Sequence, residues 1–165
     1  MKKEEKTNAI RLLEQSGADF TVHNYIASGA VSGEEIVAAL GEDPHTVYKT
    51  LVTVGKSGGH YVFLVPVCCE LDLKRAAAAV GEKSIAMIKS RELLPLTGYI
   101  HGGCSPIGMK KQFPTVIDKS AEALPRFCFS GGKIGLQIET SPADLARTVN
   151  FTFADIAMPA TGGER

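Results

Sequence analysis

Two neighbouring runs of β-branched and aromatic residues constrain the fold of this chain more than any other feature. The runs cover Val47–Val54 and His60–Val67, and the segment between them, Gly55–Gly59, is rich in glycine. Such runs favour extended backbone, and a glycine-rich connection of this length favours a reversal of the chain. The sequence therefore predicts an antiparallel β-hairpin, which needs other elements to cover its apolar faces.

Signals for helices flank this hairpin on both sides. Ser32–Glu35 is typical of a capping box, in which a serine hydroxyl and a glutamate carboxylate satisfy free amides at a helix start. Asp72 can cap another helix, and glycines at positions 17, 41 and 81 are typical helix ends. These signals predict helices over 7–15, 33–40 and 73–80. Weaker patterns predict a short helix over 91–94, a helix over 142–149, and strands over 20–25, 84–88, 114–117, 126–129, 135–139 and 151–156.

The order of these elements is mixed and lacks the regular alternation of strand, helix and strand that parallel sheets require. We therefore predict an α+β fold with a largely antiparallel or mixed sheet. The 165 residues suit one hydrophobic core, and no repeat or linker divides them, so we expect a single domain over residues 1–165. Residues 159–165 are small and polar, and we expect them to form a flexible tail.

The composition excludes several classes of protein. Hydrophobic residues make up 44% of the chain and charged residues 22%, which is typical of a soluble globular protein. The net charge is zero, so any contact with nucleic acid must be local. The longest apolar run, Tyr61–Cys69, is too short to span a membrane, and no secretory signal follows Met1. We expect a cytoplasmic protein without membrane contact.

Nothing in the sequence predicts a metal or another cofactor. The four cysteines, Cys68, Cys69, Cys104 and Cys128, form no metal-binding or disulfide pattern, and we expect reduced thiols. His101 and Cys104 are close in sequence but lack obvious further ligands.

Lys49 is the first candidate for chemistry. It lies near the start of the first predicted hairpin strand, where alternation places it on one face with Leu51 and Thr53. Thr50 lies on the other face. A lysine among apolar strand residues is exposed at an edge, extends its stem along apolar surface, or lines a cleft.

Two glycine-rich loops are the other candidates. Gly98–Gly108 can bring backbone amides close to a carbonyl oxygen, although most loops of this composition are simple connections. Ser130 precedes Gly131 and Gly132, and its hydroxyl could act as a nucleophile, bind substrate or form a turn. No histidine has the spacing of a catalytic triad and no nucleophile elbow is present, so the sequence favours binding or a turn.

Taken together and in order, seven segments resemble the YbaK/EbsC group, which belongs to the superfamily of the prolyl-tRNA synthetase editing domain. The similarity runs from about Ala9 to Ala157. The segments are Val47–Leu51, Leu71–Lys74, Thr97–Tyr99, Gly102–Lys111, Pro114–Asp118, Ser130–Leu136 and Phe153–Ala157.

The resemblance implies a fold, an activity and a mechanism. The fold is a compact α+β domain in which a curved mixed sheet, or partial barrel, flanked by helices surrounds a cleft. The activity is hydrolysis of Cys-tRNA(Pro), a product of prolyl-tRNA synthetase error, without a cofactor or metal. In this group the substrate thiol is thought to attack its own ester and release a cyclic thiolactone. We also expect lyase character beside hydrolase character.

The resemblance also implies the residues of the site. Lys49 matches the essential lysine of the group, and the segment from Gly102 to Pro106 matches its G-x-x-x-P substrate loop. Cys104 departs from the apolar residue expected in this loop, which affects the shape of the pocket. The expected catalytic residue is Lys49, and the expected substrate-binding residues are Tyr25, Thr50, Gly102, Gly103, Cys104, Ser105, Pro106, Ser130 and Gly131.

Two alternatives remain open from the sequence. The first is a deacylase of Ala-tRNA(Pro), or of a broader set of aminoacyl-tRNAs, that uses water as the nucleophile. The second is a non-catalytic module that binds a tRNA acceptor end or a nucleotide. For the favoured deacylase, the resemblance implies two partners, the cysteine-bearing acceptor end of tRNA(Pro) and prolyl-tRNA synthetase.

Overall fold

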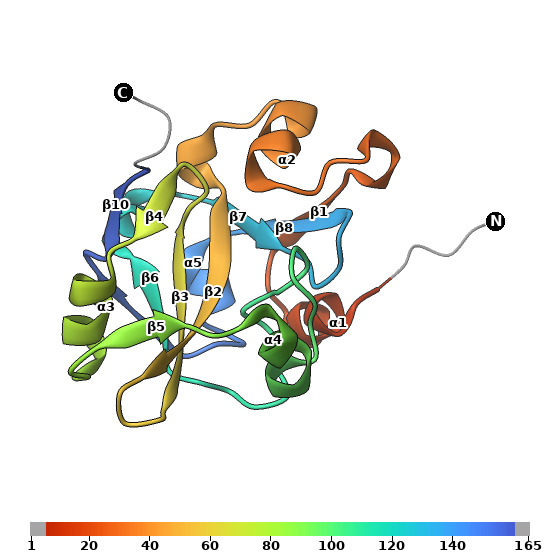
Figure 1. The fold of residues 1–165 in the computed structure, drawn as a ribbon. Helices are drawn as coiled ribbons and strands as arrows, with labels where there is room; N and C mark the ends of the chain where they lie inside the picture. The colour runs from red at the N-terminus through yellow and green to blue at the C-terminus, as the bar shows by residue number, and fades with distance from the viewer. Residues whose placement is uncertain (1–5, 161–165) are drawn as a thin grey trace.

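The predicted hairpin forms the centre of the molecule. The computed structural model describes residues 6–160. In it β2 (Tyr48–Gly55) and β3 (His60–Pro66) lie side by side (Figure 1). They pair antiparallel, with Lys49 opposite Val65. The hairpin prediction is confirmed.

Three further strands extend the hairpin into a five-stranded sheet in the order β5-β2-β3-β6-β9. β5 (Ile85–Met87) pairs antiparallel with the end of β2, whereas β6 (Thr115–Asp118) and β9 (Phe151–Ala154) run parallel to their neighbours. The sheet is therefore mixed, as predicted.

The remaining strands form two smaller antiparallel sheets. One has the order β1-β8-β7, from β1 (Phe20–Asn24), β8 (Leu136–Thr140) and β7 (Phe127–Ser130). The other pairs β4 (Cys69–Leu71) with β10 (Ala157–Pro159). The α+β class is confirmed, but the strands of residues 6–160 divide into three hydrogen-bonded sheets and do not close a barrel.

The last predicted strand, over 151–156, is wrong at its end, because β9 stops at Ala154. The carboxylate of Asp118 accepts hydrogen bonds from the backbone N–H groups of Ile156 (3.0 Å) and Ala157 (2.9 Å), and the chain then turns into β10. Pro159, where we expected a flexible tail to begin, is still part of β10 and lies opposite Cys69. Residues 161–165 of that tail lie outside the described residues.

Within residues 6–160, five α-helices pack around these sheets. The cap signals place them well, and the capping box of Ser32 and Glu35 is present. The helix predicted over 91–94 is longer than expected and the one predicted over 142–149 is shorter. The helices are α1 (Asn8–Ser16), α2 (Gly33–Leu40), α3 (Leu73–Val80), α4 (Ser90–Thr97) and α5 (Pro142–Leu145). Short 3-10 helices cover Ile26–Ser28, Pro44–Thr46 and Lys119–Ala123.

None of the helices within residues 6–160 has the length and apolar character needed to cross a membrane.

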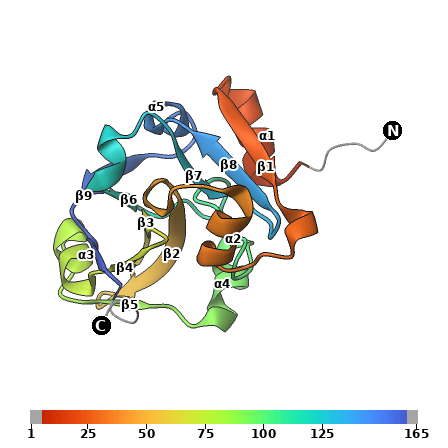
Figure 2. The ribbon, with the colours of Figure 1, turned by 90° about the horizontal axis from the view of Figure 1, so that it is seen from above.

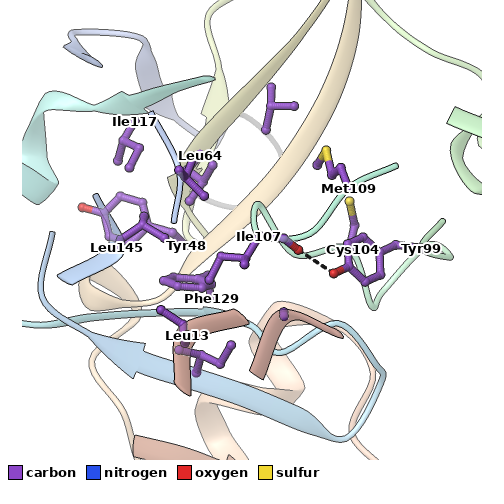
Figure 3. Close-up of a cluster of buried hydrophobic side chains, with 14 of the residues drawn as sticks. Leu13, Tyr48, Leu64, Tyr99, Cys104, Ile107, Met109, Ile117, Phe129 and Leu145 are labelled. Carbon is purple, nitrogen blue, oxygen red and sulfur yellow. Dashed lines mark hydrogen bonds between the residues drawn. The ribbon is translucent and has the colours of Figure 1, made fainter. Parts of the chain in front are cut away.

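Alternation along β3 divides the interior into two cores. Val62 and Leu64 face a large cluster that includes residues of α1 and α4, whereas Phe63 and Val65 face a smaller cluster covered by α3. Figure 2 shows α3 on one side of the hairpin and α2 and α4 on the other. Figure 3 shows part of the larger cluster, in which Phe129 of β7 packs near Tyr48 of β2. This arrangement leaves a space between β2, α2 and the loop after α4.

Candidate active site

A cavity of about 380 Å³ occupies that space. Its walls come from the start of α2, from β2, from the start of α4, from the loop after α4, and from β7 and β8 where their chain reverses. Six of the residues expected from the sequence line it: Tyr25, Lys49, Thr50, Gly102, Cys104 and Ser130. Gly103, Ser105, Pro106 and Gly131 do not belong to the lining.

The cavity follows an open edge of β2. β5 pairs only with Thr53, Val54 and Gly55, so within residues 6–160 the earlier part of β2 has no strand paired on this side. Just before β2, Val47 forms an isolated bridge with Cys128 of β7. The N–H of Ile88 donates to the carbonyl of Val52 (3.4 Å) at the point where the open edge begins. No neighbouring strand covers this edge of β2, so side chains from either face of the strand can extend past it into the cavity.

Lys49 and Thr50 illustrate this geometry. Lys49 shares a face with Leu51, which packs on the smaller core, and Thr50 shares a face with Tyr48 and Val52 in the larger core. The Lys49 ammonium has no hydrogen bond or ion pair within residues 6–160. The Thr50 hydroxyl oxygen is buried and also lacks a hydrogen-bond partner there. Both polar groups are thus available to a ligand.

The charge of Lys49 acts on one nearby thiol. Burial raises the pKa of Cys69 to about 11, and the positive charge of Lys49 acts in the opposite direction. Cys69 is neutral at neutral pH, so it does not neutralise the lysine.

The G-x-x-x-P loop is firmly supported from behind. Gly102 has a φ of +88°, a conformation that favours glycine. The Ser105 hydroxyl accepts a hydrogen bond from the N–H of Ile107 (3.3 Å), and the Tyr99 hydroxyl donates to the carbonyl of Ile107 (Figure 3). Ser105 and Pro106 are buried, so they serve to hold the loop.

Cys104 is the thiol that lies in the cavity wall, and it is a poor nucleophile. Burial raises its pKa to about 12, while a hydrogen bond with Thr97 has a smaller opposite effect. At neutral pH the thiol is protonated, and a protonated thiol attacks esters slowly. Cys104 therefore shapes the pocket.

Ser130 lies at the end of β7 and lines the cavity. Its hydroxyl accepts a hydrogen bond from the N–H of Gly132 (3.1 Å), which fits a turn-forming role. Gly131 packs behind it and donates its N–H to the carbonyl of Leu136 (2.9 Å).

Sequence reasoning missed Gln137 and Glu42. Gln137, on β8, lines the cavity and is only 3% exposed. Its amide nitrogen donates to Glu42 Oε1 (3.1 Å), and its own Oε1 is buried without a partner among the described residues. No local sequence motif marks either residue as functional. The alternation along β8 could have shown that Gln137 shares a face with Glu139, on the side of the strand opposite the core-facing Ile138.

One group of side chains has the composition of a metal site. His23, Glu42 and Cys128 each offer a ligand atom, and these atoms lie within 4.8 Å of one another. However, the His23 ring shares a 2.6 Å hydrogen bond with Glu139, and the Cys128 thiol donates to Glu42 (3.8 Å). Burial and the negative charge of Glu42 raise the pKa of Cys128, which favours the thiol over the thiolate that metals bind. Hydrogen bonds among these side chains account for the cluster.

Comparison with known proteins identifies the family. The model of the aminoacyl-tRNA editing domain matches residues 27–148. The chain belongs to the aminoacyl-tRNA editing domain family. An Enterococcus faecalis (strain ATCC 700802 / V583) protein named "Putative Cys-tRNA(Pro)/Cys-tRNA(Cys) deacylase EbsC" is 42% identical over 156 residues, which cover 94% of this chain and 95% of that protein.

Solved structures share the editing-domain fold. The crystal structure of a "putative trans-editing enzyme for prolyl tRNA synthetase" has a TM-score of 0.78 at 25% identity, and covers 93% of this chain and 99% of that one. The hypothetical protein APE2540 has a TM-score of 0.82 at 22% identity, covering 90% of this chain and 97% of that one, and shows the fold alone.

The comparisons confirm the resemblance to the YbaK/EbsC group and correct one expectation. The similar Enterococcus protein is named a deacylase, which is a hydrolase-type enzyme. The expected lyase character is therefore wrong. A hydrolase adds water across the bond that it cleaves, whereas a lyase breaks a bond without water.

Proposed function

We propose that this protein is a cytoplasmic hydrolase that removes cysteine from mischarged tRNA(Pro). The observation that supports this most directly is a cavity bounded by the unpaired ammonium of Lys49 and the G-x-x-x-P loop. Cys104 in the cavity wall is a protonated thiol and the Ser130 hydroxyl accepts a turn hydrogen bond, so neither is an activated nucleophile. An aminoacyl ester is already activated, so holding it in an attack geometry can supply much of the rate enhancement.

In the proposed reaction the substrate supplies its own nucleophile. The cysteine sulfur attacks the ester carbonyl carbon, the bond from that carbon to the ribose oxygen breaks, and the thiol proton passes to the ribose oxygen. The products are free tRNA and a cyclic thiolactone, which water then opens to cysteine. Overall one water molecule is consumed and one ester is cleaved.

The residues of the cavity have separate roles in this reaction. Lys49 attracts the terminal nucleotide through its 3′ oxygen or phosphate, with Lys89 and His101 lining the same cavity. Backbone N–H groups of the Gly102–Ser105 segment polarise the carbonyl and stabilise its developing negative charge. Tyr25 and Ser130 orient the substrate.

Replacement of Lys49 tests the proposed role directly. Lys49→Ala should abolish deacylation of Cys-tRNA(Pro) and leave the thermal unfolding temperature close to that of the parent protein, because the ammonium makes no hydrogen bond or ion pair within residues 6–160. Lys56→Ala is the matched control, since Lys56 is exposed in the turn between β2 and β3, away from the cavity. Full activity of a folded Lys49→Ala variant would refute the role of Lys49.

The nucleophile has its own test. Ser-tRNA(Pro) differs from the cysteinyl ester by one oxygen in place of sulfur, and a hydroxyl is a much weaker nucleophile than a thiol. Thiol attack therefore predicts far slower deacylation of the seryl ester. Equal rates for the two esters would instead indicate water as the nucleophile, and turnover of Ala-tRNA(Pro) in the same assay would broaden the substrate range.

The zero net charge of the chain predicts weak binding to tRNA alone, since phosphate contacts supply most non-specific affinity. We therefore propose that prolyl-tRNA synthetase delivers the mischarged tRNA. The Cys-tRNA(Pro) deacylation rate at low enzyme concentration should rise when the synthetase is added, and no change would count against this partner.

A further inference from the structure

Gln137 carries an unused hydrogen-bond acceptor at the cavity wall. The side chain is 3% exposed, and its Oε1 has no partner within residues 6–160. A buried acceptor without a partner is unfavourable and uncommon in native proteins. The residue belongs to the lining of the cavity, so a bound ligand is the natural source of the missing donor.

Glu42 fixes which end of the Gln137 amide is left free. A carboxylate can only accept hydrogen bonds, so the amide must turn its NH₂ group towards Glu42, and the 3.1 Å contact from Nε2 to Oε1 has this arrangement. The second carboxylate oxygen accepts from the Cys128 thiol (3.8 Å), which helps to hold Glu42 in place. The Gln137 oxygen is thereby directed away from Glu42.

The aminoacyl group offers a matching donor. Its α-ammonium is positively charged and can only donate hydrogen bonds. The backbone N–H groups of the G-x-x-x-P loop are donors too, so they cannot bind it. The negatively charged Glu42 contacts the NH₂ group of Gln137. Its charge makes the space beside the Gln137 oxygen more favourable for a cation than for a neutral hydroxyl. Lys49 marks a cationic part of the same cavity, suited to the ribose or phosphate end of the substrate.

We propose that Gln137 Oε1 accepts a hydrogen bond from the α-ammonium of the bound aminoacyl group, and that Glu42 is a positioning residue that holds the amide in this orientation. This inference rests on the proposed function and names the group that reads the amino end of the substrate. Because the Gln137 oxygen is buried in the free protein, binding requires this side chain to shift towards the cavity while its NH₂ group keeps the contact with Glu42.

Binding of two stable amide analogues tests the proposal without requiring turnover. One is 3′-cysteinylamino-3′-deoxyadenosine, and the other is its 3-mercaptopropionyl counterpart, which lacks only the ammonium. Calorimetry with the parent protein should show the cysteinyl analogue binding roughly 10- to 150-fold more tightly, the range expected for a hydrogen bond to a charged group. Gln137→Met keeps the length of the side chain but offers only a weakly accepting thioether sulfur, and it should remove most of this difference by weakening the cysteinyl analogue alone.

Two further variants separate positioning from general structure. Glu42→Gln keeps the shape but can also donate, so the Gln137 amide can rotate, and the difference in Kd between the analogues should shrink while the unfolding temperature stays similar. Glu139→Gln is the control: it lies two positions along β8 and contacts His23 and Arg126 instead of the cavity. It should leave the difference in Kd unchanged.

A parent protein that binds both analogues equally, or a Gln137→Met variant that keeps the full preference, would overturn the proposal. Loss of affinity for both analogues to the same extent in Gln137→Met would also overturn it, because the role would then be structural. Preference for the cysteinyl analogue without deacylation of Cys-tRNA(Pro) would refute the proposed hydrolase activity and leave the ammonium site supported.

Discussion

Gly103, in the middle of the G-x-x-x-P loop, gives the sharpest test of how the cavity wall is held. A methyl group built on Gly103 would lie 3.1 Å from the backbone nitrogen of Ile134, and 3.2 Å and 3.3 Å from the Cα and carbonyl carbon of Lys133. These are backbone atoms and cannot rotate away as the tip of a side chain could. The φ of Gly103 is not positive, so Gly103→Ala adds a packing conflict without backbone strain.

The expected effect is larger on activity than on stability. Over-packing of this kind typically costs about 1–3 kcal/mol, which for a chain of this length lowers Tm by roughly 3–10 °C. The shift also moves Gly102 and Cys104 at the cavity, and a displacement of about 1 Å in a reacting group can reduce a rate about 100-fold. Calorimetry and single-turnover deacylation of Cys-tRNA(Pro) measure the two effects separately.

Gly58→Ala provides the matched control for Gly103→Ala. Gly58 has a φ of +94° with open space around it, and it lies in the turn between β2 and β3. Its substitution should lower Tm through backbone strain and leave deacylation unchanged. The reasoning would be refuted if Gly103→Ala matched the parent protein in both Tm and rate.

Two further predictions concern titratable groups. Asp118→Asn should destabilise the protein by about 2–4 kcal/mol at neutral pH. One oxygen of the carboxylate accepts from the N–H groups of Ile156 and Ala157, and the other accepts from the N–H of Ser120. An amide has a single acceptor oxygen, so the variant must turn an NH₂ group towards a backbone donor and loses the negative charge. Burial acts to raise the pKa of Asp118, but its hydrogen bonds outweigh burial and lower it. Its contribution is therefore complete above an unfolded-state pKa of about 4 and is lost as pH falls through the folded pKa, so urea unfolding of parent and variant should converge in acid. Cys104, with a pKa raised to about 12 by burial, should react far more slowly with iodoacetamide in the folded protein than in urea, and equal rates by mass spectrometry would contradict this.

Sequence reasoning reached the parts of the site that local pattern or family resemblance marks. The hairpin pattern singles out Lys49 as a candidate, while its expected role and the choice of Thr50, Tyr25, Ser130 and the G-x-x-x-P loop follow from the resemblance. Ser105 and Pro106, which the resemblance also implies, are buried and do not belong to the cavity lining. A motif records which residues occur together and does not distinguish the lining of a pocket from its support.

The part of the site that the sequence did not indicate comes from contacts between distant segments. Glu42 and Gln137 are separated by 95 positions, and neither lies in a pattern that signals function. The cluster of His23, Glu42 and Cys128 is equally invisible in the sequence, because each residue comes from a different element.

The sequence by itself determined the hairpin, the capped helices and the α+β class, because strand alternation, helix caps and glycine turns depend on hydrogen bonds and torsion angles a few residues apart. The tertiary structure alone decided where β5 stops along β2, and therefore where the open edge and its cavity lie. It also decided which end of the Gln137 amide remains free, because that depends on a carboxylate brought beside it only when α2 packs near β8. Such choices depend on the packing of the whole chain, which no local pattern encodes.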